Sequence, residues 1–180
     1  MFWADELAAG LTGPQVVNDS KTPSGTVHVG SLRGVVLHDA ITRALRDRGL
    51  PTTFRYGVDD LDPMDSQALL TPDAIDRYMG VPLAHVPAPE GSAAASYARY
   101  FVGELFMGTF AGLGIQPEIY WMSELYGDGT MDPYIRTALD HADAIRELYW
   151  RVSGYARTEV QRNRFIAALV IIPVLKPKED

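Results

Sequence analysis

The sequence predicts an α/β fold in which a parallel sheet is flanked by helices. Three observations predict it. Short β-branched and aromatic segments alternate with segments of helical periodicity, the connections between the strand segments are long enough to hold helices, and a glycine-rich turn leads from the first strand into the first long helix. Strands joined by helical crossovers pair in parallel, and a ligand crevice is expected at their carboxyl ends.

The first three elements form a strand–helix–strand unit. A buried strand is expected over residues 16–19, and apolar residues at helical spacing predict a helix over residues 32–48. Gly49 and Pro51 are expected to end that helix, because a glycine commonly follows the last helical residue and a proline soon after it cannot continue the helix. Residues 52–58 then read as a second strand, because they are rich in β-branched and aromatic side chains.

The later elements are spaced more widely. Residues 59–92 are rich in Pro, Gly and Asp and are expected to be irregular, with at most one short helix near residues 72–78. The pattern then predicts a helix over 93–112, a third strand over 119–122, and a last helix running to Gly154 with Asp132 as its N-cap and Pro133 in its first turn. We expect one domain over residues 1–153, with 59–92 as an irregular insertion, and a separate tail over 154–180.

Composition excludes several classes of protein. The 180 residues include no cysteine, so a disulfide framework and a thiolate zinc site are not expected, and the four histidines lack metal-ligand spacing. A formal net charge of −7 repels phosphate backbones, which argues against tight nucleic-acid binding by this chain alone. Asp5 and Glu6 interrupt the opening where a signal peptide needs an apolar run, and the eleven apolar residues 165–175 are too few to span a bilayer. A cytoplasmic location without a membrane partner is therefore expected.

The glycine-rich turn predicts a nucleotide site. Residues 22–31 read Thr-Pro-Ser-Gly-Thr-Val-His-Val-Gly-Ser and run straight into the predicted helix. Free backbone N–H groups and the positive end of the helix dipole coincide at such a helix start, so it binds anions. His28 and a hydroxyl are fixed at the same place, an arrangement that suits a nucleoside triphosphate.

An acidic turn follows the second strand. Asp59, Asp60 and Asp62 lie at a predicted carboxyl end of the sheet, as does the glycine-rich turn. Carboxylates after a strand are commonly turn and cap formers. In a functional role they would face an ammonium group or a ribose, because an ammonium group in a crevice requires a carboxylate partner.

Together, these motifs give residues 2–153 a resemblance to the N-terminal catalytic domain of class I lysyl-tRNA synthetases, a Rossmann-like domain of the HUP type. The resemblance is carried by the Phe2-Trp3-Ala4-Asp5 opening, the Thr22-Pro23-Ser24-Gly25 lead-in, the His28-Val29-Gly30-Ser31 signature (the HIGH motif of class I enzymes), Arg33, and Asp59-Asp60-Leu61-Asp62-Pro63. It implies a reaction in which lysine and ATP, with Mg²⁺, give lysyl-adenylate and pyrophosphate, and the lysyl group then passes to tRNA(Lys).

The resemblance also implies roles for particular residues. His28 and Ser31 would be catalytic, with His28 stabilising the charge of the departing pyrophosphate, and Gly30 would let adenosine pack on the backbone. The implied ATP-binding residues are Thr22, Pro23, Ser24, Gly25, His28, Gly30 and Ser31. The implied lysine-binding residues are Asp19, Asp59, Asp60 and Asp62.

Three positions depart from the family pattern. Ser31 replaces the asparagine or histidine that is usual there, so its hydrogen bond to the phosphates would be looser or bridged by water. Gly34 replaces an acidic residue, which leaves vacant any role that carboxylate has toward the lysine ammonium group. Asp19 stands where small residues are more usual, and we expect it to bind that cation from the opposite wall.

The resemblance ends at about Gly154. Paired cysteines for structural zinc, the lysine-rich second signature and a helical anticodon-binding region do not follow, which suggests a truncated product lacking its C-terminal half. Two alternatives stay open. One is a non-catalytic or split remnant that binds nucleotide weakly or acts with a separate partner chain, and the other is a small nucleotidyltransferase of the same superfamily, acting on a nicotinamide or pantothenate compound. The lysyl-like opening and the acidic turn argue against the second.

Overall fold

The computed structural model describes residues 2–25, 27–65 and 70–153. Its contacts divide the chain into two compact units, Met1–Glu124 and Leu125–Asp180. The predicted separate tail over 154–180 lies outside the described residues.

A three-stranded parallel sheet forms the centre of the first unit. Its strands are β1 (Gln15–Lys21), β2 (Thr52–Val58) and β3 (Glu118–Trp121), in the order β1-β2-β3. Val17 lies opposite Phe54 on β2, and Tyr56 lies opposite Ile119 on β3. The α/β class with a parallel sheet is therefore confirmed.

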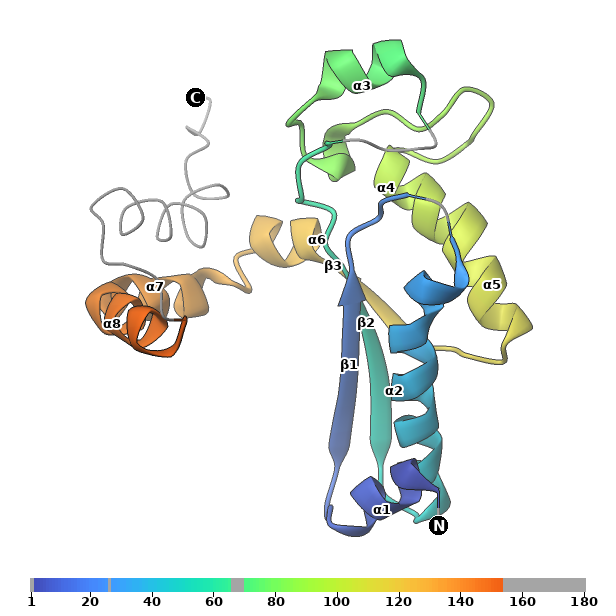
Figure 1. Cartoon of the computed structure of the whole chain (residues 1–180). Coiled ribbons are helices and arrows are strands. Elements are labelled where there is room, and N and C mark those ends of the chain that lie inside the picture. The colour runs from blue at the N-terminus through green and yellow to red at the C-terminus, as the bar shows by residue number, and fades with distance from the viewer. Residues whose placement is uncertain (1, 26, 66–69, 154–180) are drawn as a thin grey trace. The chain divides into compact units, whose positions relative to one another are not determined.

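Helix α2 (Val29–Asp47) connects β1 to β2 and packs on both strands, as Figure 1 shows. Its buried side chains Val35, Ala44 and Leu45 meet Val17 and Phe54 in the hydrophobic core. The short helix α1 (Trp3–Ala9) packs against α2 and buries two alanines completely. In Figure 1 the amino end of α2 lies at the same end of the sheet as the arrowheads of β1 and β2. This geometry brings the helix start to the carboxyl edge of the sheet.

The connection from β2 to β3 is longer. It contains α3 (Pro72–Tyr78), a 3₁₀ turn (Leu83–His85), and one continuous helical stretch made of α4 (Tyr97–Tyr100), the π-helical segment η2 (Phe101–Phe106) and α5 (Met107–Gly112). The short helix at 72–78 agrees with the prediction. The longer helix was predicted to begin at residue 93 and begins at Tyr97, because the Ser96 hydroxyl caps it by accepting a hydrogen bond from the Arg99 N–H.

Aromatic side chains join that helical stretch to the sheet. The rings of Phe106 and Phe110 lie 4.4 Å apart between centroids, and both contact Tyr56 of β2, at 5.7 and 5.2 Å. Each is buried, and tilted aromatic pairs of this kind stabilise a core beyond the area they remove from water. The end of β2 that carries the acidic turn is thus firmly packed.

The last helices differ from the prediction. Helix α6 (Met122–Gly127) follows β3 directly, and the second unit contains α7 (Asp132–Asp140) and α8 (Ala142–Ser153). The single helix predicted from residue 132 to 154 is wrong, because His141, with φ −105° and ψ 17°, breaks it. The N-cap of α7 is Met131, so Asp132 lies inside the first turn. Within the described residues, no helix has the length and apolar character needed to cross a membrane.

Candidate functional site

The glycine-rich loop and the acidic turn meet at the carboxyl ends of β1 and β2. The Thr22 hydroxyl donates a hydrogen bond to the Asp62 carboxylate. Ser20 hydrogen-bonds the Asp59 carboxylate through its side chain, and the Asp59 N–H donates to the Lys21 carbonyl at 3.1 Å. Two segments that are separate in the sequence therefore form one wall.

Local features shape the backbone of residues 22–25, which follow β1. The Ser24 N–H donates to the Thr22 carbonyl at 2.8 Å, and Pro23 between them is buried. Gly25 has φ 69°, a left-handed conformation that side chains other than glycine rarely adopt. A glycine is thus required where the chain turns toward the start of α2.

Helix α2 begins with a cap made by His28 and Ser31. The Ser31 hydroxyl accepts a hydrogen bond from the His28 N–H at 2.9 Å and donates one to the His28 carbonyl at 2.7 Å. The hydroxyl proton of Ser31 is therefore used inside the cap. The first N–H groups of a helix lack intrahelical partners, so the start of α2 offers backbone donors and a positive dipole to an anion.

The imidazole of His28 lies over Gly30. A Cβ atom at residue 30 would be 2.9 Å from Cε1 and 3.0 Å from Nδ1 of that ring, closer than side chains pack. A side chain at residue 30 would therefore displace the His28 ring. His28 is exposed, so its ring can turn away from the Gly30 backbone without breaking core packing.

Asp60 points into the protein. Its carboxylate is 1% exposed and accepts hydrogen bonds from the backbone N–H of Ser123 at 2.8 Å and from the Ser123 hydroxyl at 2.5 Å. Asp60 therefore ties the end of β2 to the start of α6. Ser123 was not among the predicted site residues, although its position directly after the third predicted strand places it at this edge of the sheet.

Asp59 is half-buried beside two other carboxylates. Burial raises the pKa of the Asp59 carboxyl above its ordinary value, the charges of Asp62 and Asp60 raise it further, and the hydrogen bond from Ser20 opposes them. The wall therefore carries unbalanced negative charge, which favours the binding of a cation.

Asp19 lies on β1, facing α2. Its Oδ1 accepts a hydrogen bond from the Ser20 N–H at 2.9 Å, and its Oδ2 is 3.5 Å from Nδ1 of His38. Burial raises the pKa of the Tyr56 hydroxyl, and the charges of Asp19 and Asp59 raise it further. Both carboxylates thus act electrostatically on one buried hydroxyl.

The structure brings most of the predicted site residues to one edge of the sheet. Hydrogen bonds join Thr22 of the glycine-rich loop to Asp62, and Ser20 at the end of β1 to Asp59. Asp60 differs, since it is bonded to Ser123. No group of three or more His, Cys, Asp or Glu side chains suited to a metal ion occurs in the part of the chain that the structure describes.

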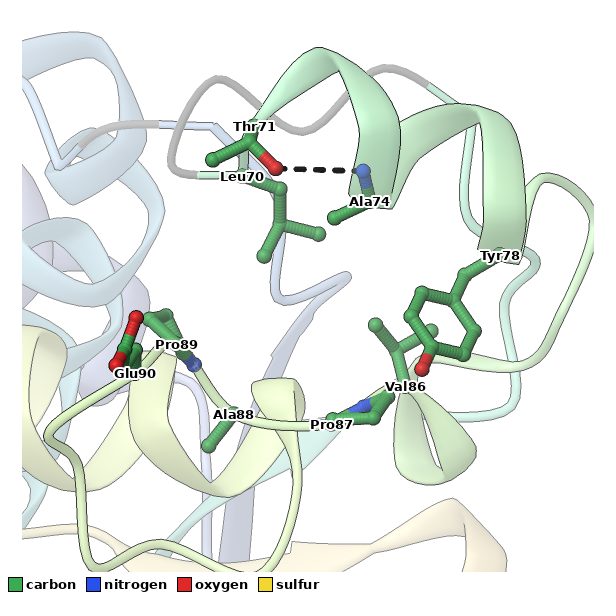
Figure 2. A pocket seen from close by; sticks show the side chains of 9 residues that line it. All are labelled: Leu70, Thr71, Ala74, Tyr78, Val86, Pro87, Ala88, Pro89 and Glu90. Atoms are coloured by element: carbon green, nitrogen blue, oxygen red, sulfur yellow. Dashed lines mark hydrogen bonds between the residues drawn. The ribbon is translucent and has the colours of Figure 1, made fainter.

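A separate cleft of about 240 Å³ lies in the connection between β2 and α4 (Figure 2). It contains none of the predicted site residues. Its lining is mainly apolar and consists of Leu70, Thr71, Ala74, Tyr78, Val86, Pro87, Ala88, Pro89 and Glu90. Thr71 caps α3 there by accepting a hydrogen bond from the Ala74 N–H at 3.3 Å.

Comparison with curated proteins finds relatives over most of the chain. The chain is 36% identical over 157 residues to a protein named lysine--tRNA ligase from Methanosarcina barkeri, covering 86% of this chain and 29% of the relative. It is 34% identical over 154 residues to the protein of that name from Thermoplasma acidophilum, with 86% and 30% covered. For the protein of that name from Archaeoglobus fulgidus, the identity is 34% over 157 residues, with 86% and 31% covered. The chain thus spans about 30% of the length of these relatives.

A family model gives the same assignment over a longer range. Residues 1–174 match the model described as tRNA synthetases class I (K). The match includes the glycine-rich loop, the acidic turn and all three strands. This chain belongs to the class I (K) family of tRNA synthetases.

Proposed function

We propose that this chain binds ATP and lysine as the adenylate-forming part of a class I lysine--tRNA ligase. The observation that carries the proposal is a pair of hydrogen bonds between the glycine-rich segment and the acidic turn. One joins Thr22 to Asp62, and the other joins Ser20 to Asp59. It supports a single site in which phosphates bind at the amino end of α2 while an ammonium group binds at the carboxylates. The name that the relatives carry, lysine--tRNA ligase, agrees with those two ligands.

The reaction joins two anionic groups. A carboxylate oxygen of lysine attacks the α-phosphorus of ATP, the bond from that phosphorus to the bridging oxygen of the β-phosphate breaks, and pyrophosphate leaves with the bonding electron pair. Such a displacement needs alignment of the reactants and stabilisation of the charge that develops on the phosphates. The loop and helix start supply both without covalent participation of the protein.

The ATP side of the site is the loop and the first turn of α2. Thr22, Pro23, Ser24 and Gly25 shape the backbone that surrounds the phosphates. His28 turns its imidazole away from Gly30, hydrogen-bonds the phosphates, and leaves the Gly30 backbone free for adenosine. Ser31 serves catalysis by fixing the helix start through its two hydrogen bonds to His28. Mg²⁺ enters as the partner of the ATP phosphates, which are its preferred ligands.

The lysine side of the site is acidic. A lysine ammonium group leaving water requires carboxylate partners, and Asp19, Asp59 and Asp62 supply them. Asp60 contributes by holding the acidic turn through Ser123.

Transfer to tRNA(Lys) in the cytoplasm completes the proposed function. With a formal net charge of −7, this chain attracts tRNA only weakly by itself, so tRNA binding is assigned to the longer family members. A second candidate, a binding module that takes up ATP and lysine without turnover, is favoured by the use of the Ser31 hydroxyl inside the cap of α2, where both of its hydrogen bonds go to His28.

Lysine-dependent exchange between ATP and pyrophosphate separates the two candidates. Exchange with lysine, absent with arginine or alanine, would establish the adenylating enzyme. Binding of lysine and ATP without exchange would establish the binding module. Exchange that depends on a different amino acid would overturn the assignment of lysine.

A further inference from the structure

Asp19 occupies the space above a helix glycine. A Cβ atom built on Gly34 would be 2.6 Å from Oδ2 of Asp19 and 3.3 Å from both Cγ and Oδ1. The carboxylate is therefore seated directly against the backbone of α2, with its side chain only 18% exposed. Any side chain at position 34 would displace it.

The backbone of α2 does not itself require glycine at this position. Gly34 lies within a regular 19-residue helix and is not among the residues with positive φ. Glycine in a helix interior is destabilising relative to alanine. The close approach of Asp19 accounts for the glycine at residue 34. Glycine there lowers the stability of the helix, but it leaves room for the Asp19 carboxylate.

His38 lies beside the same carboxylate, one turn further along the helix. Its Nδ1 lies 2.8 Å from the Gly34 carbonyl and 3.5 Å from Oδ2 of Asp19. A carbonyl oxygen only accepts hydrogen bonds, so Nδ1 carries the proton and donates it to the Gly34 carbonyl, while the Asp19 carboxylate lies beside the ring. The ring is stacked on Phe54, with 6.5 Å between centroids and 21° between planes, which fixes its orientation.

We propose that Gly34 and His38 are positioning residues that orient the Asp19 carboxylate toward the ammonium group of the amino-acid substrate. Gly34 provides the space, and the His38 ring, with its Nδ1 3.5 Å from Oδ2, lies against one carboxylate oxygen. This inference rests on the proposed function, because the ammonium group belongs to the substrate assigned there. It adds two residues to the determinants of selectivity, neither of which needs to touch the substrate.

The test measures selectivity in the 180-residue chain. The probes are two stable adenylate analogues, lysyl-sulfamoyl-adenosine and alanyl-sulfamoyl-adenosine, titrated by calorimetry. Gly34→Ala is expected to reduce the preference for the lysyl analogue at least tenfold and to leave binding of the alanyl analogue within about threefold, because the added Cβ displaces the Asp19 carboxylate. A merely structural role for Gly34 would weaken the binding of both analogues alike.

A matched control is available in α5. A Cβ atom on Gly108 would meet nothing within 4 Å, so Gly108→Ala adds helix propensity without displacing a neighbour. It should leave selectivity unchanged. His38→Phe retains the ring on Phe54 but loses the N–H, and it should lower the preference for the lysyl analogue several-fold. In an Asp19→Asn background, neither Gly34→Ala nor His38→Phe should reduce selectivity further, because both act through that carboxylate.

The outcomes are distinguishable. Unchanged selectivity in Gly34→Ala and His38→Phe, with a selective wild-type chain, would overturn the inference and leave the proposed function standing. A wild-type chain that does not prefer the lysyl analogue would overturn both.

Discussion

The carboxylate of Asp60 accepts hydrogen bonds from both the backbone N–H and the hydroxyl of Ser123, at 2.8 and 2.5 Å, across 63 residues of sequence. The pair joins the end of β2 to the start of α6, next to the wall that contains Asp59 and Asp62. A buried carboxylate is tolerated because its oxygens find donors there. The position of the acidic turn thus depends on the buried contact between Asp60 and Ser123.

Replacing Asp60 should therefore lower stability strongly. Asp60→Ala leaves two partly buried donors of Ser123 without an acceptor and empties a buried side-chain position, and we expect a loss of about 2–4 kcal/mol in the free energy of unfolding. Urea denaturation measures it. Ser123→Ala retains the backbone hydrogen bond and should cost about 1 kcal/mol. A loss below about 0.5 kcal/mol in Asp60→Ala would contradict the role given to this pair.

Ser31 should act on the helix start more than on the nucleotide. Ser31→Ala removes both hydrogen bonds to His28, and the lost cap should cost about 0.5–2 kcal/mol of stability. Since the hydroxyl proton is used inside the cap, affinity for ATP should fall by no more than about threefold. Ser31→Thr, which retains a hydroxyl, is the control. A tenfold loss of ATP affinity without loss of stability would show that the hydroxyl contacts the phosphates instead.

Asp59 should make stability depend on pH. The pKa of its carboxyl in the folded chain lies above the ordinary value of 3.8, so ionisation of Asp59 lowers the free energy of unfolding. This loss is absent below pH 3.8 and is complete above the folded-state pKa. Asp59→Asn removes it and should stabilise the chain at pH 7 by about 0.5 kcal/mol, the size of a partly exposed charge interaction. Denaturation at pH 3 and pH 7 measures the difference. The same gain at both pH values would show that ionisation of Asp59 has no part in it.

The strands and the first long helix could be predicted because local signals specify them. Residues 52–58 were predicted as a strand and form one, since β-branched and aromatic residues continue until the sheet ends. Helix α2 was predicted to begin at residue 32 and begins at Val29. Its N-cap is a histidine, which is not among the residues that usually cap a helix, and the hydroxyl of the cap comes from Ser31.

Contacts between distant residues could not be predicted in the same way. The convergence of the loop and the acidic turn follows from parallel pairing, so it was expected. The bonding of Asp60 to Ser123 depends on which strand lies beside β2 and in what register, and periodicity does not give either. Gly34 was noticed as a departure, but its contact with Asp19 depends on how α2 packs on β1.

The most direct test of a shared ATP and lysine site is the calorimetric comparison of lysyl-sulfamoyl-adenosine with its alanyl counterpart on the wild-type chain, His28→Ala and Asp19→Asn. We predict that the wild type binds the lysyl analogue at least tenfold more tightly. His28→Ala should weaken both analogues alike, whereas Asp19→Asn should weaken the lysyl analogue alone. Equal binding of the two analogues, or binding that neither substitution changes, would contradict the site described here.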